Sequence, residues 1–345
     1  MIPIQNIYYM LSYAFQVLNE QGYKNIATEQ FHNTAELMAA ILEKGIAIQL
    51  KRGLGKEYIP QTEALSSLRG KIDIAESIKT QSMLRKQLIC TYDEFSVNSI
   101  MNRIIKSTVE LLLRSNISKQ RKKNLRKLMV YFSEVDFIDS YTVNWNVQYN
   151  RNNQTYRMLI SICYLVVKGL LQTQSNGHTK LMDFLDEQRM CRLYEKFILE
   201  YYRKEFKNQI TANASQIPWQ LDNEENSMLP VMQSDIMLQS GEKVLIIDAK
   251  YYEHSTQVQF DKHTLHSGNL YQIFTYVKNK EYELREKDHT VSGMLLYAKT
   301  DEEIYPNNVY QMSGNQIAVR TLDLNLPFDE IASQLNTIAK THFDL

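Results

Sequence analysis

Two charged residues end a strongly apolar stretch of this sequence. The segment VLIIDAKYY, residues 244–252, places four aliphatic residues before Asp248, and Lys250 follows two positions later. Because side chains alternate along a strand, Asp248 and Lys250 should share one face, and the aliphatic run indicates a central strand covered on both faces. A carboxylate without a partner would be costly there, so Asp248 requires a cation, either Lys250 in a structural ion pair or a metal ion.

A second acid lies one predicted strand earlier. Asp235 belongs to the strand expected at 234–239, and the short turn SGEK leads into the next strand, so a hairpin would bring Asp235 close to Asp248. With the backbone carbonyl of Ala249, the two carboxylates would offer three hard oxygen ligands, a set that Mg²⁺ accepts while it keeps several waters. Such an ion would activate a water molecule and stabilise charge on a phosphate, and Lys250 could hold either group.

This combination resembles the PD-(D/E)xK nuclease superfamily, and three further residues fit the resemblance. Gln272 and Tyr276 are four residues apart on the next predicted helix, so they share a face and are similar to the Gln-x-x-x-Tyr element of the RecB-like branch. The alternative is a buried tyrosine with a polar neighbour. Glu195 matches the acid that these enzymes often carry on their first helix, although a glutamate facing solvent is equally compatible with its position. His266 and Asn269 are candidates for substrate contact at the mouth of the site.

The elements that would position these residues predict an α+β or α/β protein. Apolar periodicity predicts helices at 4–18, 34–50, 99–128, 156–171, 187–207, 268–279 and from Pro327 to the C-terminus. Alternation and turn residues predict strands at 87–98, 234–239, 244–250, 291–298 and near 309–323, and short strands joined by turns between Arg52 and Ile78.

This order predicts an N-terminal helical region with a small β segment, followed by a mixed sheet flanked by helices. The resemblance to the nuclease superfamily implies that this sheet is restriction-endonuclease-like. The polar segment 172–179 is the expected linker. We therefore expect an N-terminal domain at 1–177, with a β arm around 48–97, and a second domain at 178–345, which the superfamily resemblance implies is the endonuclease domain.

The charge of the whole chain does not favour tight unaided binding to nucleic acid. Its 39 basic and 39 acidic residues cancel, so any DNA contact must be local or delegated to a partner. The basic segment KQRKKNLRKLM, residues 119–129, favours a solvated helix face over a phosphate-binding patch. A partial phosphate loop at Gly53 to Lys56 lacks the required glycine and hydroxyl residue, because Leu50 and Glu57 stand at those positions. This chain is therefore not expected to hydrolyse nucleotide itself.

Cysteine usage and the N-terminal segment favour a cytoplasmic protein. The 3 cysteines are far apart and form no Cys-x-x-Cys pair, which fits a reducing compartment. The apolar N-terminus has no basic leader, and no apolar run approaches the length that a bilayer requires.

The whole chain resembles the McrC family, the nuclease subunits of McrBC restriction systems for modified cytosine. The segments IPIQNIYYMLSYAF, NRIIKST, SDIMLQSGEKVLIIDAKYY and NLYQIFTYV carry this resemblance. It implies a DNA endonuclease in which Asp235 and Asp248 bind Mg²⁺ and Lys250 is the catalytic lysine. It also implies a hexameric AAA+ GTPase partner, McrB, which binds GTP, recognises 5-methylcytosine in double-stranded DNA and is stimulated by an N-terminal arm of the McrC-like subunit.

The resemblance makes the N-terminal domain at 1–177 the partner-binding domain. The residues that would contact such a partner are less specific. Arg52, Lys56, Arg69 and Lys71 are the basic groups of the strand-and-turn segment that are best placed to enter the central pore of a hexamer. Two alternatives remain open: a non-cleaving adaptor that only activates a GTPase, and a stand-alone nuclease of the same superfamily that acts in DNA repair or defence.

Overall fold

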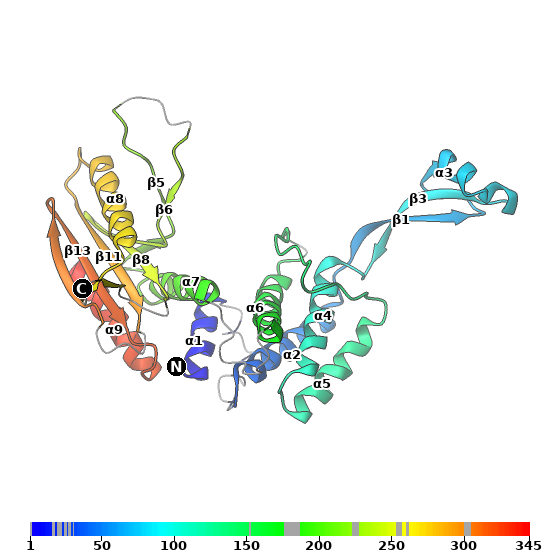
Figure 1. Cartoon of the computed structure of the whole chain (residues 1–345), viewed down its shortest axis with the longest axis horizontal. Helices are drawn as coiled ribbons and strands as arrows, with labels where there is room; N and C mark the ends of the chain where they lie inside the picture. The colour runs from blue at the N-terminus through cyan, green and yellow to red at the C-terminus, as the bar shows by residue number, and fades with distance from the viewer. Residues whose placement is uncertain are drawn as a thin grey trace. The chain divides into compact units, whose positions relative to one another are not determined.

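The computed structural model divides the chain into two compact units, which we call the sheet unit and the arm unit (Figure 1). The sheet unit comprises Met1–Ala27 and Leu185–Leu345, and the arm unit comprises Thr28–Phe184. The structure describes residues 2–15, 18, 23, 26, 29, 31–151, 153–175, 187–222, 228–252, 257–259, 262–299 and 305–345.

This division differs from the expected one at the N-terminus. Helix α1 (Ile4–Ala14) packs in the sheet unit against α7 (Glu187–Glu205), where the Tyr13 ring lies 5.2 Å from the Tyr201 ring. The Asn6 side chain also donates hydrogen bonds of 2.8 Å to the carbonyls of Leu324 and Leu326. The apolar N-terminal helix therefore completes the second half of the chain, although it was expected in the first domain.

The sheet unit contains a six-stranded mixed sheet in the order β12-β13-β11-β8-β7-β4. Strands β8, β11 and β13 are parallel, whereas β4, β7 and β12 pair antiparallel with their neighbours. The bounds are β4 Thr211–Asn213, β7 Ile236–Ser240, β8 Lys243–Lys250, β11 Thr290–Ala298, β12 Asn308–Met312 and β13 Asn315–Leu322. Two short pairs accompany the sheet: β5 Gln216–Ile217 with β6 Met232–Gln233, and β9 Gln257–Gln259 with β10 Lys262–Thr264. The predicted mixed sheet is confirmed.

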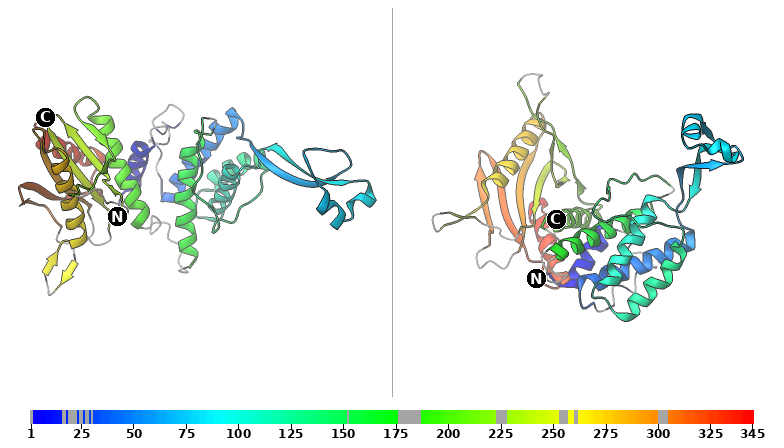
Figure 2. Two further views of the ribbon diagram at one scale, coloured as in Figure 1. Left: turned by 90° about the horizontal axis from the view of Figure 1, so that it is seen from above. Right: turned by 45° about the vertical axis from the view of Figure 1, so that its right-hand side comes forward.

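Helices cover both faces of this sheet (Figure 2). Helix α8 (Ser267–Glu283) packs on one face through Ile273 and Val277, which join the side chains of alternate residues of β8 and β11 in one apolar core. Gly293 in β11 permits this close approach, because a Cβ atom there would lie 2.8 Å from Ile273. Helices α7 and α9 (Phe328–Phe343) lie on the other face. Among the described residues, no helix combines the length and apolar character needed to cross a membrane.

The arm unit is a group of helices from which a small sheet projects (Figure 2). Its helices are α2 Thr34–Arg52, α4 Ile100–Arg114, α5 Lys119–Met129 and α6 Tyr156–Ser175, with a 3₁₀ turn at Val130–Phe132. The antiparallel sheet, in the order β1-β3-β2, consists of β1 Glu57–Leu65, β2 Lys71–Asp73 and β3 Leu88–Ser96. Helix α3 (Ile74–Lys79) and a 3₁₀ turn at Ser82–Arg85 lie between β2 and β3. We call residues 57–96 the arm.

The arm unit corrects three details of the expected secondary structure. The helix expected at 99–128 is two helices, because Ser118 accepts a hydrogen bond from the Arg121 amide and starts α5 anew. The segment expected to contain only strands and turns includes α3, which Asp73 caps by accepting from the Glu76 amide at 2.9 Å. Arg52 is the last residue of α2 and does not belong to the strands.

The expected linker is also partly helical. Residues 172–175 form the end of α6, and residues 176–179 lie outside the described part of the chain.

Candidate active site

Asp248 and Lys250 lie together at the end of β8, on the face of the sheet that α8 covers. The Lys250 Nζ atom is 2.9 Å from Asp248 Oδ2, and the side chains are only 13% and 2% exposed. Burial alone would lower the pKa of Lys250, but the adjacent Asp248 carboxylate raises it above its ordinary value. The expected pairing of opposite charges at the end of the apolar strand is therefore present, and the lysine is held as a cation.

Asp235 lies directly beside this ion pair. The register pairs Ile236 with Ile247, so the next position of each strand brings Asp235 alongside Asp248. The Asp235 carboxylate accepts a hydrogen bond of 3.0 Å from the Ala249 amide, which fixes it to the neighbouring strand. Burial and the nearby carboxylates of Asp248 and Glu195 raise the pKa of Asp235 well above its ordinary value. The hairpin thus brings two like charges together, an arrangement that a divalent cation would stabilise.

The two residues of the Gln-x-x-x-Tyr element face this cluster from α8. Gln272 Oε1 accepts a hydrogen bond of 3.3 Å from Lys250 Nζ, and Gln272 Nε2 donates one of 2.9 Å to the Tyr276 hydroxyl. A chain of polar contacts therefore runs from Asp248 through Lys250 and Gln272 to Tyr276. Gln272 gives the lysine a second hydrogen-bond partner besides the carboxylate, and this contact goes beyond the alternative of a buried tyrosine with a polar neighbour.

Glu195 enters the site from α7 on the other face of the sheet. It is half-buried, its Oε1 accepts a hydrogen bond of 3.0 Å from the Cys191 thiol, and burial raises its pKa. The Cys191 sulfur is also 3.9 Å from the Ala249 carbonyl oxygen. Glu195 is therefore not a surface charge, and a cysteine one turn earlier holds its carboxylate.

The donor atoms of this cluster suit a hard cation. Asp248 Oδ2 is buried, and apart from the Lys250 ammonium it receives no hydrogen bond from another described residue. Within the described ranges, no three His, Cys, Asp or Glu side chains converge closely enough to hold a metal ion. Two carboxylates and the Ala249 carbonyl are hard oxygen donors, and they would leave several positions of a bound Mg²⁺ to water.

An aromatic and amide network borders the site, and sequence reasoning had missed most of it. Asn269 Nδ2 donates to the Tyr297 hydroxyl at 2.9 Å, and the Tyr252 hydroxyl donates to Asn269 Oδ1 at 3.3 Å. Burial raises the pKa of Tyr297 to about 12. Asn269, expected to contact substrate, is itself buried and links the start of α8 to two strand ends. Tyr252 could have been found, because it continues the alternation of Asp248 and Lys250.

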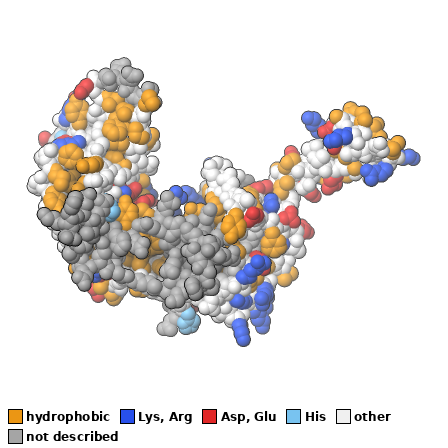
Figure 3. All heavy atoms as spheres, viewed as in Figure 1, with side chains coloured by type: hydrophobic (Ala, Val, Ile, Leu, Met, Phe, Trp, Pro, Cys, Tyr) orange, Lys and Arg blue, Asp and Glu red, His pale blue; other side chains and the backbone are white. Residues whose placement is uncertain are grey.

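The predicted partner contacts lie in the arm unit, and the structure does not gather them into one cluster. The Arg69 guanidinium lies 3.9 Å from the centre of the Tyr92 ring, and Lys56 lies 5.7 Å from the Phe95 ring. Lys71 is exposed on β2, whereas Arg52 belongs to α2. Hydrophobic and basic side chains both gather at the far end of the arm (Figure 3).

Apolar residues of the arm are the part of this surface that sequence reasoning missed. Five large hydrophobic side chains around α3 and the following 3₁₀ turn are exposed by 53% to 81%: Leu68, Ile74, Ile78, Met83 and Leu84. Such a group is unusual on a surface that faces only water, so these residues form a candidate contact surface.

Asn102 and Tyr156 fasten the root of the arm to the helices. Asn102, in the segment NRIIKST, donates hydrogen bonds of 2.9 and 2.8 Å to the carbonyls of Gly55 and Val97, which flank β1 and β3. The Tyr156 hydroxyl donates to Asn102 Oδ1 at 2.8 Å and accepts from the Gly55 amide at 2.7 Å. Both side chains are buried, so one network holds the two long strands where they enter the helical part.

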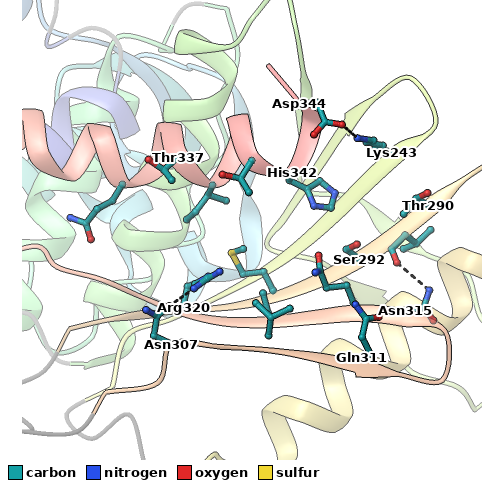
Figure 4. Close-up of a pocket in the computed structure, with 18 of the residues that line it drawn as sticks. Lys243, Thr290, Ser292, Asn307, Gln311, Asn315, Arg320, Thr337, His342 and Asp344 are labelled. Carbon is teal, nitrogen blue, oxygen red and sulfur yellow. Dashed lines mark hydrogen bonds and ion pairs between the residues drawn. The ribbon is translucent and has the colours of Figure 1, made fainter.

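A cavity of about 920 Å³ lies away from the candidate site, between α9 and strands β11, β12 and β13 (Figure 4). Its lining is mostly uncharged and polar, and it includes the ion pair of Lys243 with Asp344 and the contact of Arg320 with Asn307. None of the predicted site residues lines it. The carboxylate cluster is therefore the stronger candidate for chemistry.

Comparisons with known proteins agree over nearly the whole chain. A family model described as "McrBC 5-methylcytosine restriction system component" matches residues 5–298. The chain is 30% identical over 342 residues to the "Type IV methyl-directed restriction enzyme EcoKMcrBC" of Escherichia coli (strain K12), and the match covers 97% of this chain and 96% of that protein.

Two solved structures from Thermococcus gammatolerans are also similar. A half-complex from a tetradecameric assembly of McrB AAA+ hexamers with bound McrC matches with a TM-score of 0.48 and 18% identity, over 97% of this chain and 76% of that one. A cryo-EM structure of the McrBC complex matches with a TM-score of 0.41 and 20% identity, over 59% of each chain. From the family model and the curated relative, the chain belongs to the family of McrBC 5-methylcytosine restriction system components.

Proposed function

We propose that this chain is the Mg²⁺-dependent endonuclease subunit of a restriction complex that cleaves DNA containing 5-methylcytosine. The observation that carries the proposal is the buried cluster of Asp235, Asp248 and Lys250, held by Gln272 from α8. A purely structural ion pair would need only the aspartate and lysine of β8. A second carboxylate beside them, with a raised pKa, costs stability and is typical of functional sites.

Each residue of the cluster has a separate task in phosphodiester hydrolysis. Asp235, Asp248 and the Ala249 carbonyl would hold Mg²⁺. The bound ion supplies a water of lowered pKa and stabilises the charge that develops on the phosphate. The Ala249 amide orients Asp235, and Asp248 with Gln272 orients the Lys250 ammonium. Because it has no acceptor lone pair while protonated, Lys250 donates hydrogen bonds to a phosphate oxygen or to the attacking water.

The partner in this proposal is a hexameric AAA+ GTPase of the McrB type, which binds GTP and reads the modified cytosine. The arm is the element of this chain that fits such a partner. It projects from the helices, its root is fixed by Asn102 and Tyr156, and its far end exposes both apolar and basic side chains. Apolar anchors with a polar surround are typical of protein interfaces. We place the stimulation of the partner's GTPase in this arm.

The test is cleavage of a methylated plasmid by the full chain with its GTPase partner, GTP and Mg²⁺. Asp248→Ala and Lys250→Ala should abolish cleavage and leave stimulation of GTP hydrolysis intact, because both residues lie outside the arm unit. The matched control is Lys207→Ala. Lys207 ends the one other acid-x-Lys sequence of the chain, Glu205-Phe206-Lys207, and it is exposed just after α7. This control should cleave like the wild type.

The same experiment distinguishes the nuclease subunit from a non-cleaving adaptor and from a stand-alone nuclease. Undiminished DNA cleavage by both the Asp248→Ala and the Lys250→Ala variants would refute the nuclease assignment. A wild-type chain that stimulates the GTPase and never cleaves DNA would be an adaptor. Cleavage without partner and GTP would instead indicate a stand-alone nuclease.

A further inference from the structure

Helix α5 carries an unusual concentration of positive charge. Its 11 residues, KQRKKNLRKLM, include Lys119, Arg121, Lys122, Lys123, Arg126 and Lys127 and no acidic residue. The chain as a whole has equal numbers of basic and acidic residues. The excess is therefore local to this helix.

One of these cations is used by the fold and fixes the rotation of the helix. The Arg121 guanidinium forms ion pairs of 2.7, 3.3 and 2.9 Å with Glu29, Glu36 and Glu43. Its side chain is 16% exposed, and Leu125 on the same side is fully buried. The inward face of α5 is thus defined by Arg121 and Leu125.

The other five cations lie on the opposite side in one band along the helix, which we call the basic stripe. Lys119, Lys122, Lys123, Arg126 and Lys127 follow the spacing i, i+3, i+4, i+7 and i+8, which places them on one helix face. All but the half-buried Lys122 are exposed. Basic side chains gather over α5 in the space-filling view (Figure 3). Within the part of the chain that the structure describes, none of the five forms an ion pair with an acidic residue.

This arrangement is unfavourable for a face that meets only water. Solvated helix faces commonly mix charges of both signs, and unlike charges four residues apart stabilise the helix. Here Lys119 with Lys123, and Lys123 with Lys127, place like charges at that spacing, which destabilises the free helix. An anionic ligand would remove this repulsion.

We propose that the basic stripe binds the phosphate backbone of double-stranded DNA. This inference rests on the proposed function, because DNA is the substrate of the complex. Eight residues of helix rise span about 12 Å, and duplex DNA presents a phosphate charge about every 1.7 Å along its axis. The stripe can therefore meet several phosphates at once.

The composition of the stripe favours DNA over an acidic protein surface. Four of its five residues are lysine, which is depleted at the core of protein interfaces, whereas aromatic residues and arginine are enriched there. The exposed Val130 and Tyr131 follow only after the helix has ended. Lysine and arginine contacts to phosphates add affinity without reading sequence. Such a contact complements a partner that reads the modified base.

The test measures binding of the full chain to a fluorescent duplex by anisotropy across a series of NaCl concentrations. All proteins carry Asp248→Ala and the buffer lacks Mg²⁺, so cleavage does not interfere. The stripe variant combines Lys119→Gln, Lys123→Gln, Arg126→Gln and Lys127→Gln. The matched control removes three lysines and one arginine from exposed positions of the sheet unit: Lys207→Gln, Arg285→Gln, Lys287→Gln and Lys340→Gln.

The stripe variant should bind the duplex less tightly at low salt, and its affinity should depend less on the salt concentration. Each phosphate contact contributes about 0.9 to the slope of log K against log[salt], so loss of all four should lower the slope by about 3.6. An unchanged slope, or an equal loss in the matched control, would overturn the proposal. Thermal unfolding should be unaltered or improved, because repulsion is relieved. If the fourfold variant does not fold, the pairs Lys119/Lys123 and Arg126/Lys127 are tested separately with the same criterion.

Association of these proteins with the GTPase partner is measured in parallel, and cleavage is measured with the wild-type chain, its partner, GTP and Mg²⁺. A stripe variant that binds DNA normally but no longer associates with the GTPase would show that the stripe is a protein interface, and this would also overturn the proposal. A reduced salt slope of the stripe variant would support DNA binding by the basic stripe even if the wild-type complex failed to cleave DNA. In that case only the proposed nuclease function would fail.

Discussion

The network at the root of the arm leads to a quantitative prediction for Asn102→Ala. The substitution would remove one partner of the buried Tyr156 hydroxyl and the amide donor to two part-buried groups, the carbonyls of Gly55 and Val97. A buried polar group left without a partner costs about 1–3 kcal/mol. We count each of the three groups at the lower limit, because the carbonyls are only part-buried and the Tyr156 hydroxyl still accepts from the Gly55 amide. The sum is a loss of about 3 kcal/mol in the free energy of unfolding of the arm unit.

Fluorescence can report this unfolding separately from that of the sheet unit. The chain has 2 tryptophans, Trp145 in the arm unit and Trp219 in the sheet unit. In a Trp219→Phe background, urea unfolding followed by Trp145 therefore measures the arm unit. The exposed Asn116 provides the control, because Asn116→Ala should change stability by less than about 0.5 kcal/mol.

Two further variants test whether Asn102 and Tyr156 anchor the arm. Asn102→Asp keeps the shape but turns an oxygen toward two carbonyl oxygens, so it should destabilise at least as much as alanine. Tyr156→Phe should couple with Asn102→Ala by about 0.5 kcal/mol or more, since the two side chains share a hydrogen bond. Additive effects, or a loss below about 1 kcal/mol for Asn102→Ala, would refute the assignment of this network as the anchor of the arm.

Three other predictions follow from single positions. Gly293→Ala should lower the unfolding free energy of the sheet unit by about 1–3 kcal/mol in urea, because its Cβ would press on α8; an unchanged midpoint would contradict this packing. Burial and the nearby Lys243 ammonium lower the pKa of His342, so the unfolded chain binds more protons, and stability should fall as pH decreases through about 6.5. Thermal scans at about pH 8 and pH 5.5 should show a smaller acid loss for His342→Gln, and equal losses would refute the link. Leu84→Ser, at an 81% exposed position of the arm, should weaken stimulation of the partner's GTPase without lowering thermal stability, and full stimulation would exclude Leu84 from the interface.

Local patterns were sufficient to locate the candidate site. Alternation along β8 placed Asp248 and Lys250 on one face, and a turn too short to allow another topology placed Asp235 beside them. Helical spacing likewise placed Gln272 and Tyr276 on one face of α8. These features depend on residues that are near one another in the sequence, and periodicity reports such relations directly.

Features that depend on contacts between residues distant in the sequence could not be predicted from local patterns. The sequence alone determined the strand-end cluster, the mixed sheet and the absence of a complete phosphate loop. Only the tertiary structure decided that α1 packs with the sheet unit, that Gln272 contacts Lys250, and that Arg121 turns inward and leaves the basic stripe facing outward. The physical reason is that each of these depends on which apolar and charged partners a side chain meets across the fold, and spacing along the chain does not specify those partners.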